Sequence, residues 1–392
     1  MIAARWATPQ NAPIDLAPHV QAVVASDHPI EMAEISYGAG GGIADQTVER
    51  LFGGRLLVVT AKCRLPGEYT LVAVNAKSEG VMLNGPMVKY DGRRFDGMYS
   101  LVIDEALPEP EVVHGSRDLT DAVESGVRAI ELDPDAVFAF PSHNLPIRRN
   151  RRWCVITHAC PVPVTIHPTR CSVGNARLWF DLCDFTRRIS GSDFWICGSS
   201  CTFYAGNLHE ESWLHGQEYA WFERSAMHHG VSGFNVCDAA IDCEVSYCSG
   251  DQYSRTGLVW RSEAHAIVSA GGRHPDWYQC DPRTVNAIIA DSTWTGRPAG
   301  AASGTTAGQG FFVNSDVANP TRNVAVIGCV LDQDAHTTGD GAKAVNIVKG
   351  AEDVAIVACR IAGGVAIAQN ESVRRISWQD NASPTGTPII LR

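Results

Sequence analysis

Short runs of alternating apolar and polar residues recur along the C-terminal two thirds of the chain. VAVIGCVL at 324–331 and VAIVACRI at 354–361 share one pattern, with aliphatic residues at the first and third positions and Cys at the sixth. Apolar residues that alternate by two are typical of half-buried β-strands and not of helices. The sixth and eighth positions have the opposite parity to the first and third. The alternation therefore slips once, which predicts a bend between two short strands.

Further copies of this motif follow a variable period. The sixth position falls at Cys160, Cys183, Cys201, Cys248, Ser292, Cys329, Cys359 and Trp378. A period of this size, built on short β-prone runs, is typical of a solenoid with insertions between its turns. Two short strands joined by a bend, both apolar on the inside, fit the corner of a parallel β-helix. The cysteines are then small core residues, stacked about 4.8 Å apart.

A helix signal precedes the repeats. In SRDLTDAVESGVRAIELDPDAVFAF at 116–140, Ser116 or Asp118 can cap a short helix and Gly126 can end it. A short helix that closes the first turn of such a solenoid resembles the right-handed parallel β-helix (pectate-lyase-like) family, notably phage tailspikes and related particle spikes. The resemblance implies an all-β fold, with a right-handed single-stranded parallel β-helix and an N-terminal helical cap over 113–392.

The first part of the chain lacks the motif. It contains the β-prone runs RLLVVTAKC, YTLVAVNAK and YSLVIDEA, followed by ALPEPEVVHGS at 106–116, which is typical of a linker. We predict a small β-rich domain over 1–112. Spikes of the type that this chain resembles often carry a particle-anchoring domain in this place. The resemblance thus implies an attachment role, with other particle proteins as partners.

Composition narrows the partners and the compartment. The formal charge is −11 and the pI about 5.6, which disfavours nucleic acid as a partner. No apolar run is long enough to insert into a membrane, and the N-terminus has no signal-peptide pattern. The thirteen cysteines form no CxxC pair. We expect free thiols, no metal and no cofactor in a protein made in the bacterial cytoplasm and displayed on a particle surface.

Candidate catalytic residues lie in two polar stretches. NLHEESWLHGQEYAWFERSAMHHG at 207–230 is rich in His and Glu but does not match HExxH, and we interpret it as a solvated loop. CSGDQYSRTGLVWRSEAH at 248–265 supplies Asp251, Arg255 and Glu263 as candidate catalytic residues. Glycosidases need two carboxylates. Polysaccharide lyases of the fold that this chain resembles use a basic residue or Tyr as base.

Aromatic residues supply the candidate ligand contacts. Trp179 and Trp195 take the outward parity on neighbouring turns, and Trp213 and Tyr253 lie in the two polar stretches. Outward Trp side chains suit stacking on sugar rings or burial between chains. Cover by the HEESWLHGQEYAW loop is the alternative.

These features favour a spike or fibre subunit of a phage-like particle, either a phage or a gene transfer agent. It would bind a bacterial surface polysaccharide with the solenoid, as a homo-oligomer and by resemblance a trimer. The alternative is a polysaccharide lyase or glycoside hydrolase on the same fold. A self-associating scaffold without a ligand is the third reading.

Overall fold

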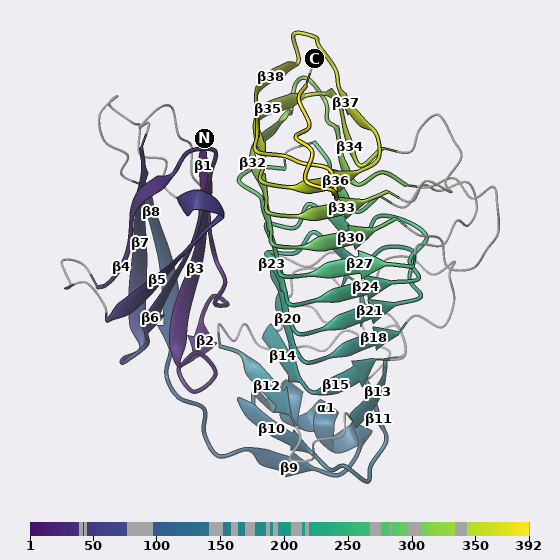
Figure 1. Ribbon diagram of the computed structural model, residues 1–392. Helices are drawn as coiled ribbons and strands as arrows, with labels where there is room; N and C mark the ends of the chain where they lie inside the picture. The colour runs from purple at the N-terminus through teal and green to yellow at the C-terminus, as the bar shows by residue number, and fades with distance from the viewer. Residues whose placement is uncertain are drawn as a thin grey trace.

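The computed structural model is almost entirely β-structure. It describes residues 1–38, 42, 45–76, 97–140, 152–157, 164–168, 177–185, 189–190, 195–204, 214–215, 219–266, 276–282, 284–296, 308–333 and 343–391. The chain forms a right-handed parallel β-helix with a β-sandwich beside it (Figure 1). The fold predicted from the repeats is therefore confirmed.

Three parallel sheets make the solenoid, and the six turns, or rungs, from β20 to β37 each contribute one short strand to each of them. The 12-stranded sheet contains β9 (Glu111–Val113), β10 (Ala129–Leu132), β12 (Cys154–Thr157), β14 (Arg177–Asp181), β17 (Trp195–Ser199), β20 (Tyr219–Glu223), β23 (Ala239–Ile241), β26 (Leu258–Trp260), β29 (Ile288–Ala290), β32 (Thr321–Ile327), β35 (Ala351–Val357) and β38 (Val373–Gln379).

The other two sheets complete the turns. The 10-stranded sheet contains β11 (Phe138–Phe140), β13 (Val164–Pro168), β15 (Cys183–Phe185), β18 (Thr202–Tyr204), β21 (Ala226–His228), β24 (Glu244–Ser246), β27 (Glu263–His265), β30 (Thr293–Thr295), β33 (Val330–Asp332) and β36 (Arg360–Ala362). The 6-stranded sheet contains β22 (Phe234–Asn235), β25 (Tyr253–Ser254), β28 (Tyr278–Cys280), β31 (Phe311–Asn314), β34 (Val345–Lys349) and β37 (Val365–Ile367). A two-stranded sheet pairs β16 (Ile189–Ser190) with β19 (Leu214–His215).

The bend predicted inside the motif is formed by the residue at its fifth position, whose backbone has the left-handed (αL) conformation. In the described rungs from β14 onward, one residue per rung turns the chain out of the 12-stranded sheet with a positive φ. This corner row consists of Leu182, Ser200, Arg224, Asp242, Arg261, Asp291, Gly328, Ala358 and Asp380. A single αL residue reverses which side of the chain faces inward, so the alternation slips once per rung. Non-glycine residues accept the strain here because the strand pairs on both sides fix the backbone.

The sixth position is an inner row of small residues, as predicted, but two of its members were assigned wrongly, and a third, Cys160, lies outside the described residues. The strand register places Cys183, Cys201, Ser225, Cys243, Ser262, Ser292, Cys329, Cys359 and Asn381 in this row. Cys243 stands where Cys248 was predicted, and Asn381 where Trp378 was predicted. Complete rungs with serine at this position were missed because the search followed cysteine. The longest predicted insertions are therefore rungs themselves.

The cysteines of this row are buried thiols. Among the described residues eleven cysteines are free and buried, and five of them belong to the row. Serine in the row accepts the backbone N–H of the preceding rung, as Ser292 Oγ does from Ser262 N at 3.1 Å. The small space at this position of each rung can therefore be filled by either a cysteine or a serine side chain.

Replacement of Cys329 tests the size limit of this row. Cys329→Ser should change the free energy of unfolding by about 1 kcal/mol or less, because the new hydroxyl can bond to the preceding rung. Cys329→Phe should cost about 1–3 kcal/mol or more by overpacking a site with 0% exposure. Chemical denaturation of both variants measures the difference. A Phe variant as stable as the parent would mean that position 329 does not face the core.

A single helix closes the N-terminal end of the solenoid. α1 (Ser116–Ser125) buries Leu119, Ala122 and Val123 over the first rung, and Gly126 ends it with φ 84. The predicted N-cap is wrong: Gly115 occupies that position, and no side chain caps the helix. The Ser116 hydroxyl instead accepts the backbone N–H of Ala139 at 2.8 Å. It ties the helix to β11.

The N-terminal domain is a sandwich of two four-stranded sheets. One contains β1 (Ile2–Trp6), β3 (His19–Ser26), β6 (Leu56–Lys62) and β5 (Gln46–Leu51), and the other β2 (Ala12–Pro13), β8 (Gly97–Asp104), β7 (Gly67–Asn75) and β4 (Ile30–Tyr37). A 3₁₀ turn, Phe52–Gly54, links β5 to β6. The boundary lies slightly earlier than predicted, because β9 already pairs with β10 of the solenoid.

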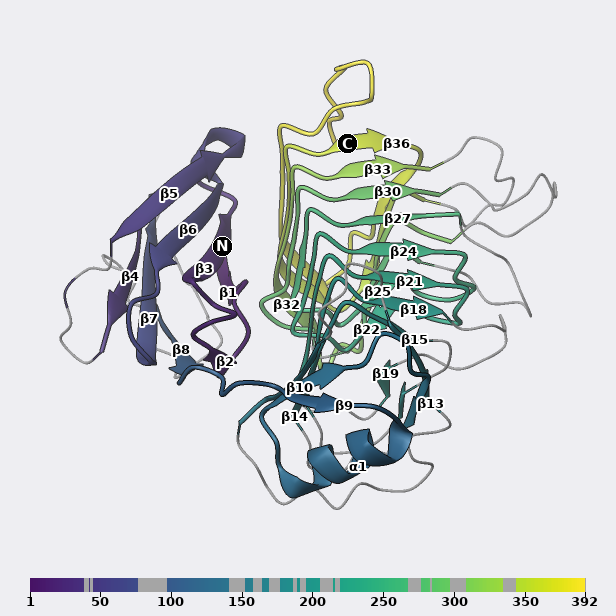
Figure 2. The same cartoon turned by 90° about the horizontal axis from the view of Figure 1, so that it is seen from below.

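The sandwich lies along the outer face of the 12-stranded sheet (Figure 2). One apolar cluster runs through both parts of the chain. Hydrogen bonds pin the contact: the Arg5 guanidinium donates to the carbonyl oxygens of Asn286 at 2.8 Å and Val285 at 3.0 Å. At the C-terminal rungs, Arg55 pairs with Asp380 at 2.6 Å. The sequence predicted a linker at 106–116 between two domains, and in the structure the two parts of the chain share one apolar core.

Candidate functional site

Three tryptophans on the outer face of the 12-stranded sheet anchor the N-terminal domain. Trp153, Trp179 and Trp221 are 0%, 3% and 4% exposed, and the Trp179 ring lies 5.9 Å and 5.7 Å from the other two. The indole of Trp221 donates to the Ala7 carbonyl at 3.0 Å, and that of Trp153 to the Gln10 carbonyl at 2.9 Å. The N-terminal domain thus covers this face, and it was not among the covers that we considered for Trp179 from the sequence.

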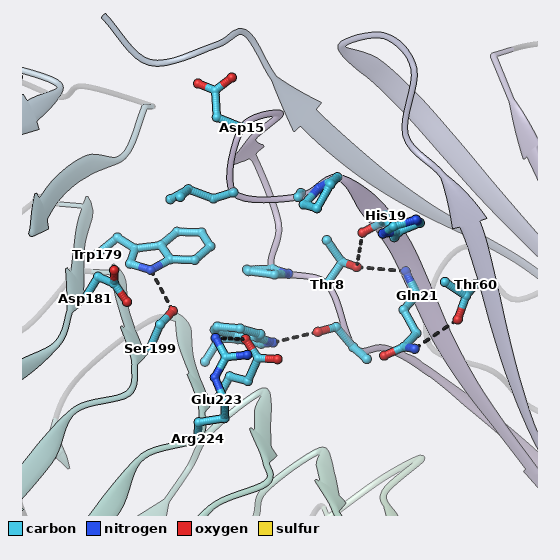
Figure 3. A pocket seen from close by; sticks show the side chains of 16 residues that line it. Thr8, Asp15, His19, Gln21, Thr60, Trp179, Asp181, Ser199, Glu223 and Arg224 are labelled. Atoms are coloured by element: carbon cyan, nitrogen blue, oxygen red, sulfur yellow. Dashed lines mark hydrogen bonds and ion pairs between the residues drawn. The ribbon is translucent and has the colours of Figure 1, made fainter. Parts of the chain in front are cut away.

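Beside these rings, the two parts of the chain enclose a pocket of about 520 Å³ (Figure 3). Ligand sites often lie at such domain interfaces. The solenoid wall contains Trp179, Asp181, Ser199, Trp221, Glu223 and Arg224. The N-terminal wall contains Ala7, Thr8, Pro9, Asp15, Leu16, Ala17, Pro18, His19, Gln21 and Thr60.

Two carboxylates flank a hydroxyl on the solenoid wall. Asp181, Ser199 and Glu223 are in register on β14, β17 and β20. The Cα atoms of the two acids are therefore two strand spacings apart, about 9.6 Å. Inverting glycosidases hold their carboxyl groups roughly 6.5–9.5 Å apart, and retaining ones roughly 5–5.5 Å. The register thus places two acids on one face of the sheet with a hydroxyl between them, which is the pair of groups that such a reaction needs.

The two acids have different surroundings. Burial raises the pKa of Glu223, and the Arg224 cation, whose Nη2 lies 3.3 Å from Glu223 Oε2, opposes that rise. The Glu223 side chain is 29% exposed. Asp181 accepts a hydrogen bond from Thr157 Oγ1 at 3.4 Å. Of the two acids, Glu223 is thus the one whose protonated form is favoured by burial.

Hydrogen bonds hold the remaining wall residues in place. Trp179 Nε1 donates to Ser199 Oγ at 3.0 Å, so the hydroxyl proton is left to donate elsewhere. Across the pocket, Gln21 N donates to Thr8 Oγ1 at 2.8 Å and Gln21 Nε2 to Thr60 Oγ1 at 2.9 Å. Both walls therefore present polar groups that hydrogen bonds fix in place, an arrangement that suits sugar hydroxyls.

The predicted catalytic residues do not share a site. Asp251 precedes β25 of the 6-stranded sheet, whereas Glu263 begins β27 of the 10-stranded sheet. Arg255 sits at the corner between β25 and β26, and its Nε donates to Asp281 Oδ2 at 2.9 Å. The prediction is wrong as a constellation, because residues close in sequence leave the solenoid on different faces. Of the three, Glu263 lies near other acid–base groups, Glu244 and His265.

The predicted ligand contacts divide in the same way. Trp179 lines the pocket. In the strand register Trp195 lies opposite Arg177, two residues before Cys197, which lies opposite Trp179. The side chain of Trp195 lies outside the described part of the structure. Trp213 also lies outside the described residues. Tyr253 is corrected: it is 0% exposed in the core, and its hydroxyl donates to the Glu263 carbonyl at 3.1 Å.

The sequence held a signal for the pocket acids. WFDLCDF at 179–185 and WFERSAM at 221–227 are copies of one motif, with Trp, Phe and an acid in the same order. We interpreted the second copy as part of a loop because Ser225 replaces cysteine. Reading it as a rung would have placed Asp181 and Glu223 in one outward row.

Known proteins add little to this picture. No family model matches the chain, and no curated protein matches it. Among solved structures, Dex49A from Penicillium minioluteum is similar with a TM-score of 0.18 and 11% identity, over 93% of this chain and 82% of that one. Within the described residues, no group of three or more His, Cys, Asp or Glu side chains is placed to hold a metal, and no helix could cross a bilayer.

Proposed function

We propose that the protein is a glycoside hydrolase that binds a bacterial surface polysaccharide in the interdomain pocket and cleaves it with inversion. The observation that carries this proposal is the acid pair, Asp181 and Glu223, set two strand spacings apart beside Trp179 and Trp221. Two acids at this separation leave room for a water molecule on one face of a sugar ring. The acid pair thereby favours the hydrolase hypothesis over a role in binding alone.

The surroundings assign the two roles. Glu223, whose pKa is raised by burial, is the general acid that protonates the glycosidic oxygen. Asp181 is the general base that takes a proton from the attacking water. Ser199 lies between them, and its hydroxyl is free to donate to the water or to Asp181 because it already accepts from Trp179. The bond from the anomeric carbon to the leaving oxygen breaks as the bond to water forms.

The test is cleavage by the unmodified protein. Purified protein should release reducing ends from at least one member of a panel of bacterial capsular and exopolysaccharides. Proton NMR of the first product should show the anomer opposite to that of the substrate. Cleavage that keeps the anomeric configuration would contradict the assigned pair. Binding of a polysaccharide without any cleavage would leave only the binding role.

The pH dependence follows from the position of Arg224. Activity should fall as pH rises through the pKa of Glu223, because only the protonated acid can donate. Arg224→Ala removes the cation that lowers this pKa, so the alkaline limb of the pH–rate profile should move to higher pH. The shift should be about 0.2–0.7 unit, since the Arg224 side chain is 59% exposed and screened. A shift to lower pH would contradict the acid role of Glu223.

A second candidate role is that of a spike subunit on a phage-like particle, attached through the N-terminal domain. The sandwich uses the sheet of β1, β3, β5 and β6 against the solenoid, which leaves the outer sheet available to other particle proteins. Val102 on that outer sheet is 38% exposed. Recovery of the chain in particles purified from the source organism, and a trimeric mass in solution, would support this role. Its absence from such particles would reject it.

A further inference from the structure

A cluster of acid–base side chains lies on the outer face of the 10-stranded sheet. On β21, β24 and β27, the middle residues Met227, Val245 and Ala264 are buried in the core, so the residues on either side of each point outward. The outward residues of these strands include His228, Glu244, Glu263 and His265, and together with Tyr247, which follows β24, we name them the histidine–glutamate patch. None of them takes part in the pocket.

Contacts tie the patch together. Glu244 Oε1 lies 3.5 Å from His265 Nε2 and 3.9 Å from His228 Nδ1. His228 Nδ1 also lies 2.5 Å from Ser246 Oγ, which sits between the two imidazoles in the register. Glu263 stands next to Glu244 on the neighbouring strand and is exposed. The patch therefore presents a row of hydrogen-bonding groups repeated at strand spacing.

An aromatic pair borders this row. Tyr247 follows β24 and is 40% exposed, and its ring stacks on His229 at 4.6 Å with an interplanar angle of 10°. An exposed, supported aromatic ring is a stacking surface for the apolar face of a sugar. Carboxylates next to such a ring accept hydrogen bonds from pairs of sugar hydroxyls.

The patch and the pocket are continuous along the backbone. Glu223 ends β20 in the pocket wall, Arg224 turns the corner, and β21 then carries His228 onto the patch. The corner row continues with Asp242 and Arg261, which pair at 2.5 Å. A chain that starts in the pocket meets this corner first and the patch second.

We infer that the substrate is an extended neutral polysaccharide whose end occupies the pocket and whose following sugars cross the Arg224 corner onto the histidine–glutamate patch. This inference rests on the proposed hydrolase function. A pocket of about 520 Å³ suits the end of a chain. The strand spacing of about 4.8 Å is close to the advance of one sugar unit in an extended chain. The Glu244 and Glu263 carboxylates on adjacent strands repel a polymer of uronic acids, which leaves a neutral polymer as the fitting ligand.

The experiment separates binding along the patch from chemistry in the pocket. The Glu223→Gln protein and its derivative with Glu244→Ala and Glu263→Ala are run by native affinity electrophoresis in gels that contain dextran, mannan, galactan or polygalacturonate. At least one neutral polymer should retard the parent, and the patch variant should bind that polymer at least tenfold more weakly. Hydrolysis of para-nitrophenyl glycosides, measured with Glu223 restored, should be unchanged by the patch substitutions.

Asp332→Ala is the matched control, because Asp332 lies on the same sheet two strands beyond His265. It should be retarded like the parent, and all variants should melt at the parental temperature. Equal retardation of parent and patch variant, or retardation of the parent by polygalacturonate alone, would overturn the inference. Loss of the proposed function is seen separately, as a wild-type protein that cleaves neither polymers nor glycosides.

Discussion

Glu223→Gln should lower the rate of polysaccharide cleavage by about 10²–10⁴-fold while binding is kept. The amide is nearly isosteric with the protonated acid but cannot donate the proton to the leaving oxygen. Asp181→Asn should cause a loss of the same order, because the amide cannot accept the proton of the attacking water. Initial rates of reducing-end release, with affinity electrophoresis as the binding measure, check both variants.

Two further observations make this prediction specific. A substrate with a good leaving group, such as a dinitrophenyl glycoside, should rescue Glu223→Gln but not Asp181→Asn, since only the first lacks the general acid. Asp251→Asn serves as control, because it lies outside the pocket and should keep parental activity. An Asp251 variant without activity beside an active Glu223 variant would move the site to the 6-stranded sheet.

Gly328→Ala should destabilise the protein by about 2–4 kcal/mol, through a contact between the two parts of the chain. Gly328 occupies the left-handed corner row with φ 66, and a Cβ there would overlap the ring of Phe52 from the N-terminal domain. Ala358 holds the same corner position on the next rung with φ 54. The αL conformation alone is thus tolerated by alanine, and the ring accounts for most of the cost.

A double-mutant cycle isolates this contact. Phe52→Ala removes the ring, so Gly328→Ala should cost less in that background by about 1–3 kcal/mol, measured by chemical denaturation. Ala358→Gly is the control at the equivalent corner position and should change stability by about 1 kcal/mol or less. An equal cost of Gly328→Ala with and without the ring would show that the domain does not pack at this corner.

The repeat motif determined the fold because its physical basis is local. Alternation by two, a single slip and a small residue at the sixth position are enough to specify two strands and a corner, and Leu182, Gly328 and Ala358 take the αL bend that the slip requires. Stacking then repeats the same environment on each rung. Length, net charge and the β-prone runs of the N-terminal part were likewise readable without a structure.

The predicted repeat register was wrong where the sixth position of the motif holds serine in place of cysteine, two residues of similar size but different chemistry. Ser225 and Ser262 fill the same volume as Cys201 and accept the same kind of backbone hydrogen bond, so a search for cysteine skipped their rungs. The error had a functional consequence: the rung that carries Glu223 was interpreted as a loop. A search for small residues in place of cysteine would have recovered it.

The candidate site required the tertiary structure. The sequence determined by itself that Trp179 points outward from a parallel β-helix, because strand parity is a local property. It did not determine what covers that face, since the docking of residues 1–104 on the 12-stranded sheet depends on contacts between residues far apart, such as Arg5 with Asn286. Only this docking turns the outward row of Asp181, Ser199 and Glu223 into one wall of a pocket. Burial then separates Glu223 from an ordinary surface acid, and burial is decided by the fold as a whole.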